Sequence, residues 1–117
     1  LFGSNQDNKG LQLADVSPQM EETQDYFTSM IRTEVEKINN QKTPENEKLI
    51  EDSFAQLEIL EKQYTDLTFE LKESNEDNRV IYAMISNFQR RIDVLQNLVE
   101  QIDNIKRIKT TNYENYT

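Results

Sequence analysis

The chain contains no cysteine, no histidine and no tryptophan, and only two glycines and two prolines among its 117 residues. Without cysteine there is no disulfide framework and no thiolate chemistry, and without histidine the most common general base and metal ligand are missing. The scarcity of glycine and proline excludes a sandwich or barrel with many turns. These absences favour long helices in one small domain and leave an enzyme without its usual groups.

Long apolar runs are also absent. No stretch of about 18 apolar residues is present, so we expect no membrane-spanning segment within the chain. The first residues do not have the basic, apolar and small-residue pattern of a signal peptide. Because the chain begins with Leu1 instead of methionine, we expect further sequence upstream, where an anchor would lie.

The charge is negative and unevenly spread. The formal net charge is −9 at pH 7, which repels a phosphate backbone, so we expect no nucleic acid partner. Residues 21–77 carry 16 acidic and 6 basic side chains, whereas residues 78–109 carry 3 acidic and 6 basic ones. We interpret this asymmetry as pairing of the basic segment with the acidic segments within one fold.

A first helix is predicted to begin at Ser17-Pro18. Ser17 can accept a hydrogen bond from a free amide of the first turn, and the φ angle of Pro18 already suits the first helical position. Apolar residues then recur at helical spacing to about residue 39, namely Phe27, Ile31, Val35 and Ile38. Residues 1–16 contain both glycines and show no periodicity, so they are predicted to form a flexible lead-in.

Two further helices follow. Thr43-Pro44 repeats the start signal, and Ser74 to Asp77 interrupts the apolar pattern. Either Ser74 together with Asp77, or Asp77 alone, can cap the helix that follows. The heptad positions of the second helix are Ile50, Leu57, Leu60, Tyr64, Leu67 and Leu71. Those of the third are Ile81, Ile85, Phe88, Ile92, Leu95, Val99 and Ile102. The helical domain is predicted over residues 17–109, with a frayed tail over residues 110–117.

The predicted fold is all-α: an antiparallel three-helix bundle built on a long hairpin of the second and third helices, with the first helix in its groove, and possible as a dimer. Ile59 and Phe69 lie off the main stripe, so they indicate contact with the first helix, self-association or scattered exposure. Together with Phe27 and Ile31 on the first helix, they are the candidate interaction residues.

The remaining residues indicate no catalytic, cofactor or metal site. A carboxylate-bridged metal site in a bundle needs inward glutamates and normally a histidine, but the carboxylates of the second helix fall on outward heptad positions. They are Glu47, Glu51, Glu58, Glu61, Asp66 and Glu70. Most phenylalanines and Tyr64 lie on the helical stripes, where core packing accounts for them.

Several stretches resemble a known group. They are LADVSPQM at residues 13–20, Tyr26-Phe27, NRVIYAMI at residues 78–85 and NFQRRI at residues 87–92. They resemble small proteins of Bacteroidetes that are labelled anti-sigma factors, over nearly the whole chain. The resemblance implies the helical extracytoplasmic part of a protein in which a cytoplasmic segment and one transmembrane helix come first. Sigma binding would belong to that cytoplasmic segment, so no functional residues carry over to this chain.

Two functions therefore compete. In the first, the chain is the periplasmic sensory or dimerisation module of a regulator anchored in the inner membrane, with a protein partner or a second copy as its ligand. In the second, it is a coiled-coil scaffold or a chaperone-like helical hairpin without a signalling role. In the first case we expect the first helix to dock on the other two in one state and to be released or exchanged with a neighbouring subunit in the other.

Overall fold

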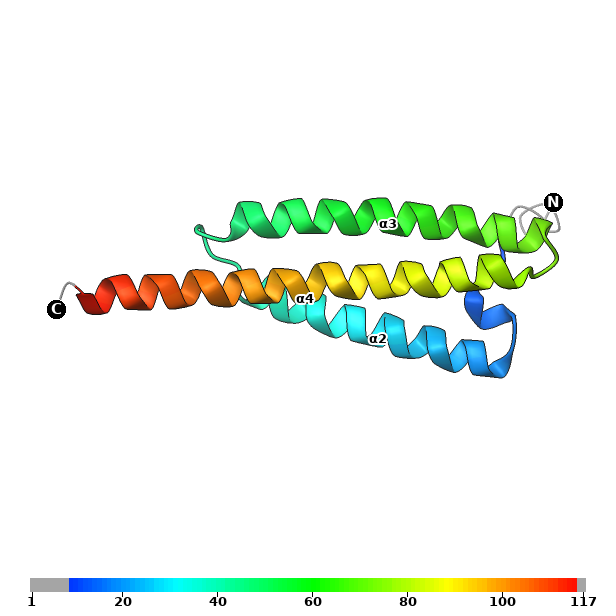
Figure 1. Ribbon diagram of the computed structural model, residues 1–117, viewed down its shortest axis with the longest axis horizontal. Helices are drawn as coiled ribbons and strands as arrows, with labels where there is room; N and C mark the ends of the chain where they lie inside the picture. The colour runs from blue at the N-terminus through cyan, green and yellow to red at the C-terminus, as the bar shows by residue number, and fades with distance from the viewer. Residues whose placement is uncertain (1–8, 116–117) are drawn as a thin grey trace.

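The computed structural model describes residues 9–115, and side chains to residue 111. It consists of a 3-10 turn η1 (Leu13–Asp15) and three helices, α2 (Pro18–Asn40), α3 (Glu47–Glu73) and α4 (Asn78–Asn115). Helices α3 and α4 form an antiparallel hairpin, and α2 runs beside α4 (Figure 1). The predicted all-α three-helix bundle is confirmed. No helix in this described part of the chain is both long and apolar enough to cross a membrane.

Helix α2 begins where the sequence predicts. The Ser17 hydroxyl accepts a hydrogen bond of 3.1 Å from the Met20 amide, and Pro18 is the first helical residue. The side chain therefore satisfies one of the amides that a helix start leaves without an intrahelical partner.

Helix α3 begins at Glu47, three residues later than Thr43-Pro44 predicts. The reason is Asn46, which is buried. Its Oδ1 accepts from the Thr43 amide at 2.8 Å, and its Nδ2 donates to the Gln41 carbonyl at 3.0 Å. These two bonds hold residues 41–46 as a loop, because an asparagine side chain can replace backbone partners in a turn.

Helix α3 ends in a Schellman motif at the turn before α4. The Glu76 amide donates to the Leu71 carbonyl at 2.9 Å and the Asn75 amide to the Lys72 carbonyl at 3.4 Å. Both Asn75 (φ 56°) and Glu76 (φ 64°) are left-handed. Asp77 then caps α4 by accepting from the Arg79 amide at 2.8 Å, as the sequence predicts.

Glycine at position 76 is expected to stabilise the chain. A left-handed backbone costs an L-residue about 1–2 kcal/mol, whereas glycine adopts it freely but loses about 0.5–1 kcal/mol of unfolded-state entropy. Glu76→Gly should therefore raise the free energy of unfolding by up to about 1 kcal/mol in urea denaturation. The control Glu58→Gly, at an exposed position in the middle of α3, should lower it by about 1 kcal/mol. Equal effects of the two variants would contradict this account of the turn.

The core follows the predicted stripes and divides into two clusters. One joins Ile38 of α2 to Ile50 and Leu57 of α3 and to Leu95 of α4. The other lies near the turn between α3 and α4 and contains Phe88. None of the predicted heptad residues of α3 and α4 is exposed. The heptad frame is therefore confirmed on α3. On α4 it is wrong at every second position, where the seam lies one residue earlier than predicted: Met84, Arg91 and Leu98 are buried, and Ile85, Ile92 and Val99 are only partly buried.

A polar layer on α4 lies between the two clusters. Asn87 and Arg91 are both buried. The Asn87 Nδ2 donates to the Leu60 carbonyl at 2.8 Å, and the Arg91 Nε donates to the Asn87 Oδ1 at 3.0 Å. The Arg91 guanidinium lies over the rings of Phe88 at 4.6 Å and Tyr64 at 5.3 Å. Burial lowers the pKa of this arginine, since desolvation disfavours the charged form.

Helix α2 does not lie evenly in the groove of the hairpin. It contacts α4 and η1 much more than α3. Near Asn40 it lies close to α4, and toward Pro18 it diverges from the hairpin (Figure 1). Residues 9–16 occupy the region where α2 diverges, and Leu13 is fully buried there. The prediction of a flexible lead-in is therefore wrong for residues 9–16, while residues 1–8 lie outside the described part.

The predicted frayed tail is wrong for residues 110–115, because α4 continues to Asn115. No glycine or proline interrupts the sequence there, and the Thr110 hydroxyl donates to the Lys106 carbonyl at 3.0 Å. Residues 116–117 lie outside the described part.

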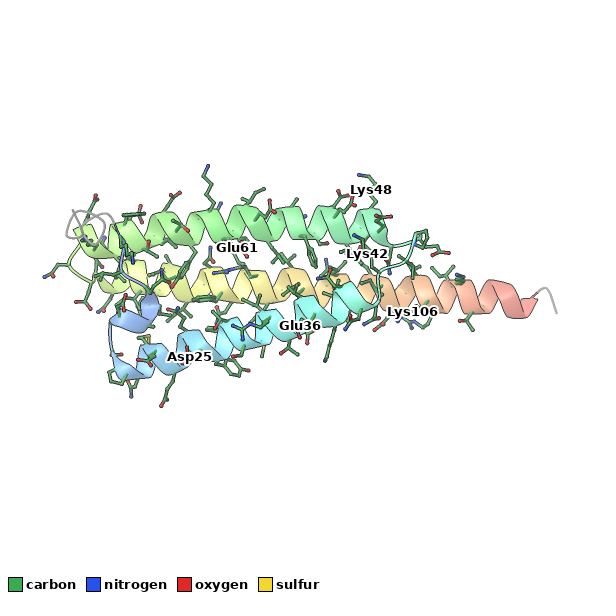
Figure 2. All side chains as sticks on the ribbon, turned by 180° about the vertical axis from the view of Figure 1, so that it is seen from behind. Asp25, Glu36, Lys42, Lys48, Glu61 and Lys106 are labelled. Carbon is green, nitrogen blue, oxygen red and sulfur yellow. The ribbon has the colours of Figure 1, made fainter. Side chains whose placement is uncertain are left out.

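Contacts between basic and acidic segments occur at both ends of the hairpin. Lys109 pairs with Glu45 at 3.1 Å, and Arg79 pairs with Asp77 at 3.0 Å. Lys106 lies beside the loop before α3 and donates to the Gln41 side chain at 2.6 Å (Figure 2). Exposed pairs of this kind contribute about 0–1 kcal/mol each, so the apolar core provides most of the stability.

Candidate functional site

Carboxylates do not converge into a site in the described part of the chain. No group of three or more acidic residues there could hold a metal ion. Asp25, Glu36 and Glu61 lie on separate parts of the surface (Figure 2). The six carboxylates that the heptad frame places outward on α3 are all exposed, as predicted. They form a solvated face, and this distribution offers no set of metal ligands.

The candidate interaction residues fall into two groups. Phe27 stacks on Phe88 with ring centroids 5.4 Å apart and planes 7° from parallel, and Ile31 packs against both core clusters. Ile59 and Phe69 lie on α3, with exposed fractions of 60% and 41%. The structure therefore uses the first pair to hold α2 on the hairpin. It leaves the second pair uncovered, so self-association through these two residues stays a prediction.

The best-defined recognition in the structure is the docking of residues 9–16 on α2 and α3, and we call this segment the clasp. The Leu11 amide donates to the Thr68 carbonyl at 2.8 Å, and the Leu13 amide donates to the Tyr64 hydroxyl at 3.2 Å. The Ala14 amide donates to the Gln24 Oε1 at 2.8 Å. Three backbone amides of one short segment are therefore bound by groups from two helices, α2 and α3.

Tyr64 and Gln24 connect the clasp to both helices. The Tyr64 hydroxyl, which accepts from Leu13, lies 3.4 Å from the Gln24 Oε1 that also accepts from Ala14. The tyrosine ring packs against Phe88 at 4.8 Å. A movement of the clasp would therefore disturb a hydrogen-bond network and an aromatic cluster at the same time.

Gly10 permits the clasp to approach α3. A Cβ atom at this position would lie 2.1 Å from the Thr68 Oγ1 and 2.6 Å from the Thr68 carbonyl carbon. Because one of these atoms belongs to a helix backbone, a side-chain rotation cannot make room. The Thr68 hydroxyl also donates to the Thr65 carbonyl at 2.6 Å, which fixes it against the helix. Glycine is thus required here for close approach.

Sequence reasoning missed the clasp because the two glycines and the lack of periodicity indicated flexibility. A signal was present in Leu11, Leu13 and Val16, three apolar residues within a segment assigned to solvent. The burial of Thr68 had no sequence signal, since a threonine on a heptad flank is normally exposed. The need for glycine at position 10 becomes visible only when the position of α3 is known, because it arises from a tertiary contact.

The Tyr64 hydroxyl is expected to make stability depend on alkaline pH. Burial is the main cause that raises the pKa of Tyr64 above its usual 10. The unfolded chain therefore loses the hydroxyl proton at lower pH than the folded chain does. The stabilisation that the protonated hydroxyl provides is complete below pH 10 and is lost as pH rises from 10 through the folded-state pKa.

The control for this pH dependence is Tyr64→Phe. It removes the partner of the Leu13 amide and should lower the free energy of unfolding by about 1–3 kcal/mol at pH 7. The difference from the natural chain should shrink above pH 10, as measured by urea denaturation at both pH values. A difference that stays constant with pH would contradict this role of the hydroxyl.

The open surface of the hairpin offers little chemistry beside the clasp. The shallow groove between α3 and α4 is lined by Gln63, Asp66, Glu70, Ser86 and Arg90, among others. These groups are suited to contact with solvent or a polar protein surface. Comparison with known proteins adds no assignment, because no protein-family model, curated protein or solved structure matches the chain.

Proposed function

We propose that this chain is a non-enzymatic protein-interaction module: the periplasmic sensory or dimerisation domain of a membrane-anchored anti-sigma-type regulator. The observation that carries the proposal is the clasp. Residues 9–16, which precede α2 in the sequence, are bound to α2 and α3 through their backbone amides. Displacement of the entering chain would therefore reach the core directly.

The movable part of this module is residues 9–40, which comprise the clasp and α2 and which we call the N-terminal body. It touches the hairpin through the clasp and through one seam on α4 that includes the Phe27–Phe88 stack. The hairpin keeps a core of its own between α3 and α4. A signal acts by binding one arrangement of these two parts better than the other.

The proposed location rests on the resemblance of residues 13–20, 78–85 and 87–92 to extracytoplasmic parts of Bacteroidetes anti-sigma-type proteins. In that setting an anchor would precede the clasp in the chain. Tension or rotation at the anchor would act on residues 9–16 first, and the body would transmit it to the hairpin. The partner is a protein surface or a second copy, since the described residues offer no convergent ligand set.

The proposal is tested by loosening the clasp in the organism that carries the gene. Gly10→Ala is introduced at the natural locus, and transcripts are compared with those of cells carrying Lys9→Ala, whose side chain is exposed. We expect Gly10→Ala alone to change transcription of a defined gene set, with the protein still present at normal abundance. Unchanged transcription at normal abundance would contradict a regulatory role.

The second candidate is a static scaffold, favoured by the continuous heptad packing of α3 against α4. In that case the two variants would give equal transcription, and the body would be as firmly held as the hairpin. The two candidates therefore differ in a measurable property of residues 18–38.

A further inference from the structure

The N-terminal body and the hairpin are joined by a single short loop. Residues 41–46 are the only covalent connection between residues 9–40 and residues 47–115, and most of them are exposed. The loop is closed by Asn46, which binds Gln41 and Thr43, and by the Lys109–Glu45 pair. A fully extended chain of six residues spans about 20 Å, so the body can reach beyond its own hairpin.

The body is itself one compact unit. Within it, η1 packs on α2, and the Ala14 amide is bound by Gln24. Val16 and Met20 join the same apolar cluster as Leu13. The body can therefore move as one piece, carrying its apolar face and its free backbone amides with it.

Separation of the body from the hairpin would expose two apolar faces, and each face fits the other. On the body they are Leu13, Phe27 and Ile38, and on the hairpin they include Phe88 and Leu95. The clasp adds backbone-directed bonds to Thr68 and Tyr64 and a position where only glycine fits. A released body and a vacated hairpin thus expose apolar surface that a second copy covers with identical contacts.

From this we infer that two copies of the chain exchange their N-terminal bodies, residues 9–40 of one docking on the α3–α4 hairpin of the other around the loop 41–46. The exchange rests on the proposed function and deepens it, because it names the partner surface as the second copy's hairpin. The exchanged pair repeats every contact between the body and the hairpin, and only the contacts that close the loop are lost. Its population therefore depends on local concentration and on how easily the loop opens.

The inference is tested by complementation between two full-length variants. Gly10→Ala damages the body and leaves its hairpin intact. Thr68→Leu damages the hairpin, by filling the space against which Gly10 lies, and leaves its body intact. Only exchange can bring the intact body of one chain onto the intact hairpin of the other. The second half of that dimer carries both substitutions, but they disrupt the same contact, so together they cost little more than either alone and the dimer regains one intact contact.

We expect each variant alone to sediment mainly as a monomer at a concentration where the equimolar mixture sediments mainly as a dimer. Native mass spectrometry with one isotopically labelled chain should show that this dimer contains both variants. A mixture that sediments as the sum of its two components would overturn the inference. The matched control replaces Gly10→Ala by Lys9→Ala, which leaves the body intact and should give no gain in dimer on mixing.

A second variant keeps the test decisive if either substitution prevents folding. Deleting residues 41–46 joins Asn40 directly to Glu47, so no loop remains in which α2 can turn back onto its own hairpin. Exchange predicts a dimer with unchanged helix content by circular dichroism, and loss of helical structure or a folded monomer would overturn it. The transcription experiment is independent, since release without exchange would still change transcription while giving no mixed dimer.

Discussion

Gly10→Ala is expected to lower the free energy of unfolding by about 2–4 kcal/mol and to detach residues 9–16 from α3. The added Cβ would lie 2.6 Å from a backbone carbon of Thr68, so the segment must move away. It then loses the hydrogen bonds of Leu11 and Leu13, at about 1 kcal/mol each, and the burial of the Leu13 side chain. The cost is limited to the docking energy of the segment, because the hairpin can remain folded without it.

Urea denaturation measures this difference, and Lys9→Ala is its control in the same segment. The Lys9 side chain is exposed, and the Lys72 ammonium binds its carbonyl, which alanine retains. We expect Lys9→Ala to change stability by less than about 0.5 kcal/mol. If Gly10→Ala were equally silent, the close approach of the clasp to α3 would be refuted.

Leu95→Asp is expected to prevent stable folding. Leu95 is fully buried in the cluster that joins all three helices. An aspartate there would place a carboxylate among the apolar side chains of the cluster and remove the packing of Leu95, which costs several kcal/mol and exceeds what a small domain can lose.

Circular dichroism and urea denaturation give the measurement, and Glu58→Ala is the control. Glu58 is exposed on α3 and should change the midpoint very little. Similar urea midpoints for Leu95→Asp and Glu58→Ala would contradict the position of Leu95 in the core.

The hairpin could be predicted from local patterns because its stability is organised by periodicity. Ile50, Leu57 and Leu71 on α3 and Leu95 and Ile102 on α4 are buried as their heptad positions require. The Ser17 and Asp77 caps were equally predictable, since a helix start has a defined local chemistry.

Errors arose where a tertiary contact overrides a local signal. Thr43-Pro44 has the pattern of a helix start, but Asn46 forms a loop there by binding residues 41 and 43. Gly10 indicates flexibility by its type, whereas its lack of a side chain allows a close contact with a helix 58 positions later in the sequence. The clasp depends on that distant helix, so no local pattern contains it.

The candidate site was predictable only in part. Phe27 and Ile31 were correctly placed on the apolar face of the first helix, where they now hold the body to the hairpin. Gln24 and Thr68 were not singled out, because an isolated polar residue on a helix gives no indication that it will bind a backbone group of another segment.

Hydrogen exchange on the full chain tests the central claim most directly, because it measures how readily the N-terminal body separates from the hairpin. The body meets the hairpin along one seam and the clasp, whereas residues 81–102 lie in the centre of α4 and contact both other helices. We predict weaker protection of amides in residues 18–38 than in residues 81–102 at neutral pH. Equal protection in the two segments would contradict a separable body and favour the static scaffold.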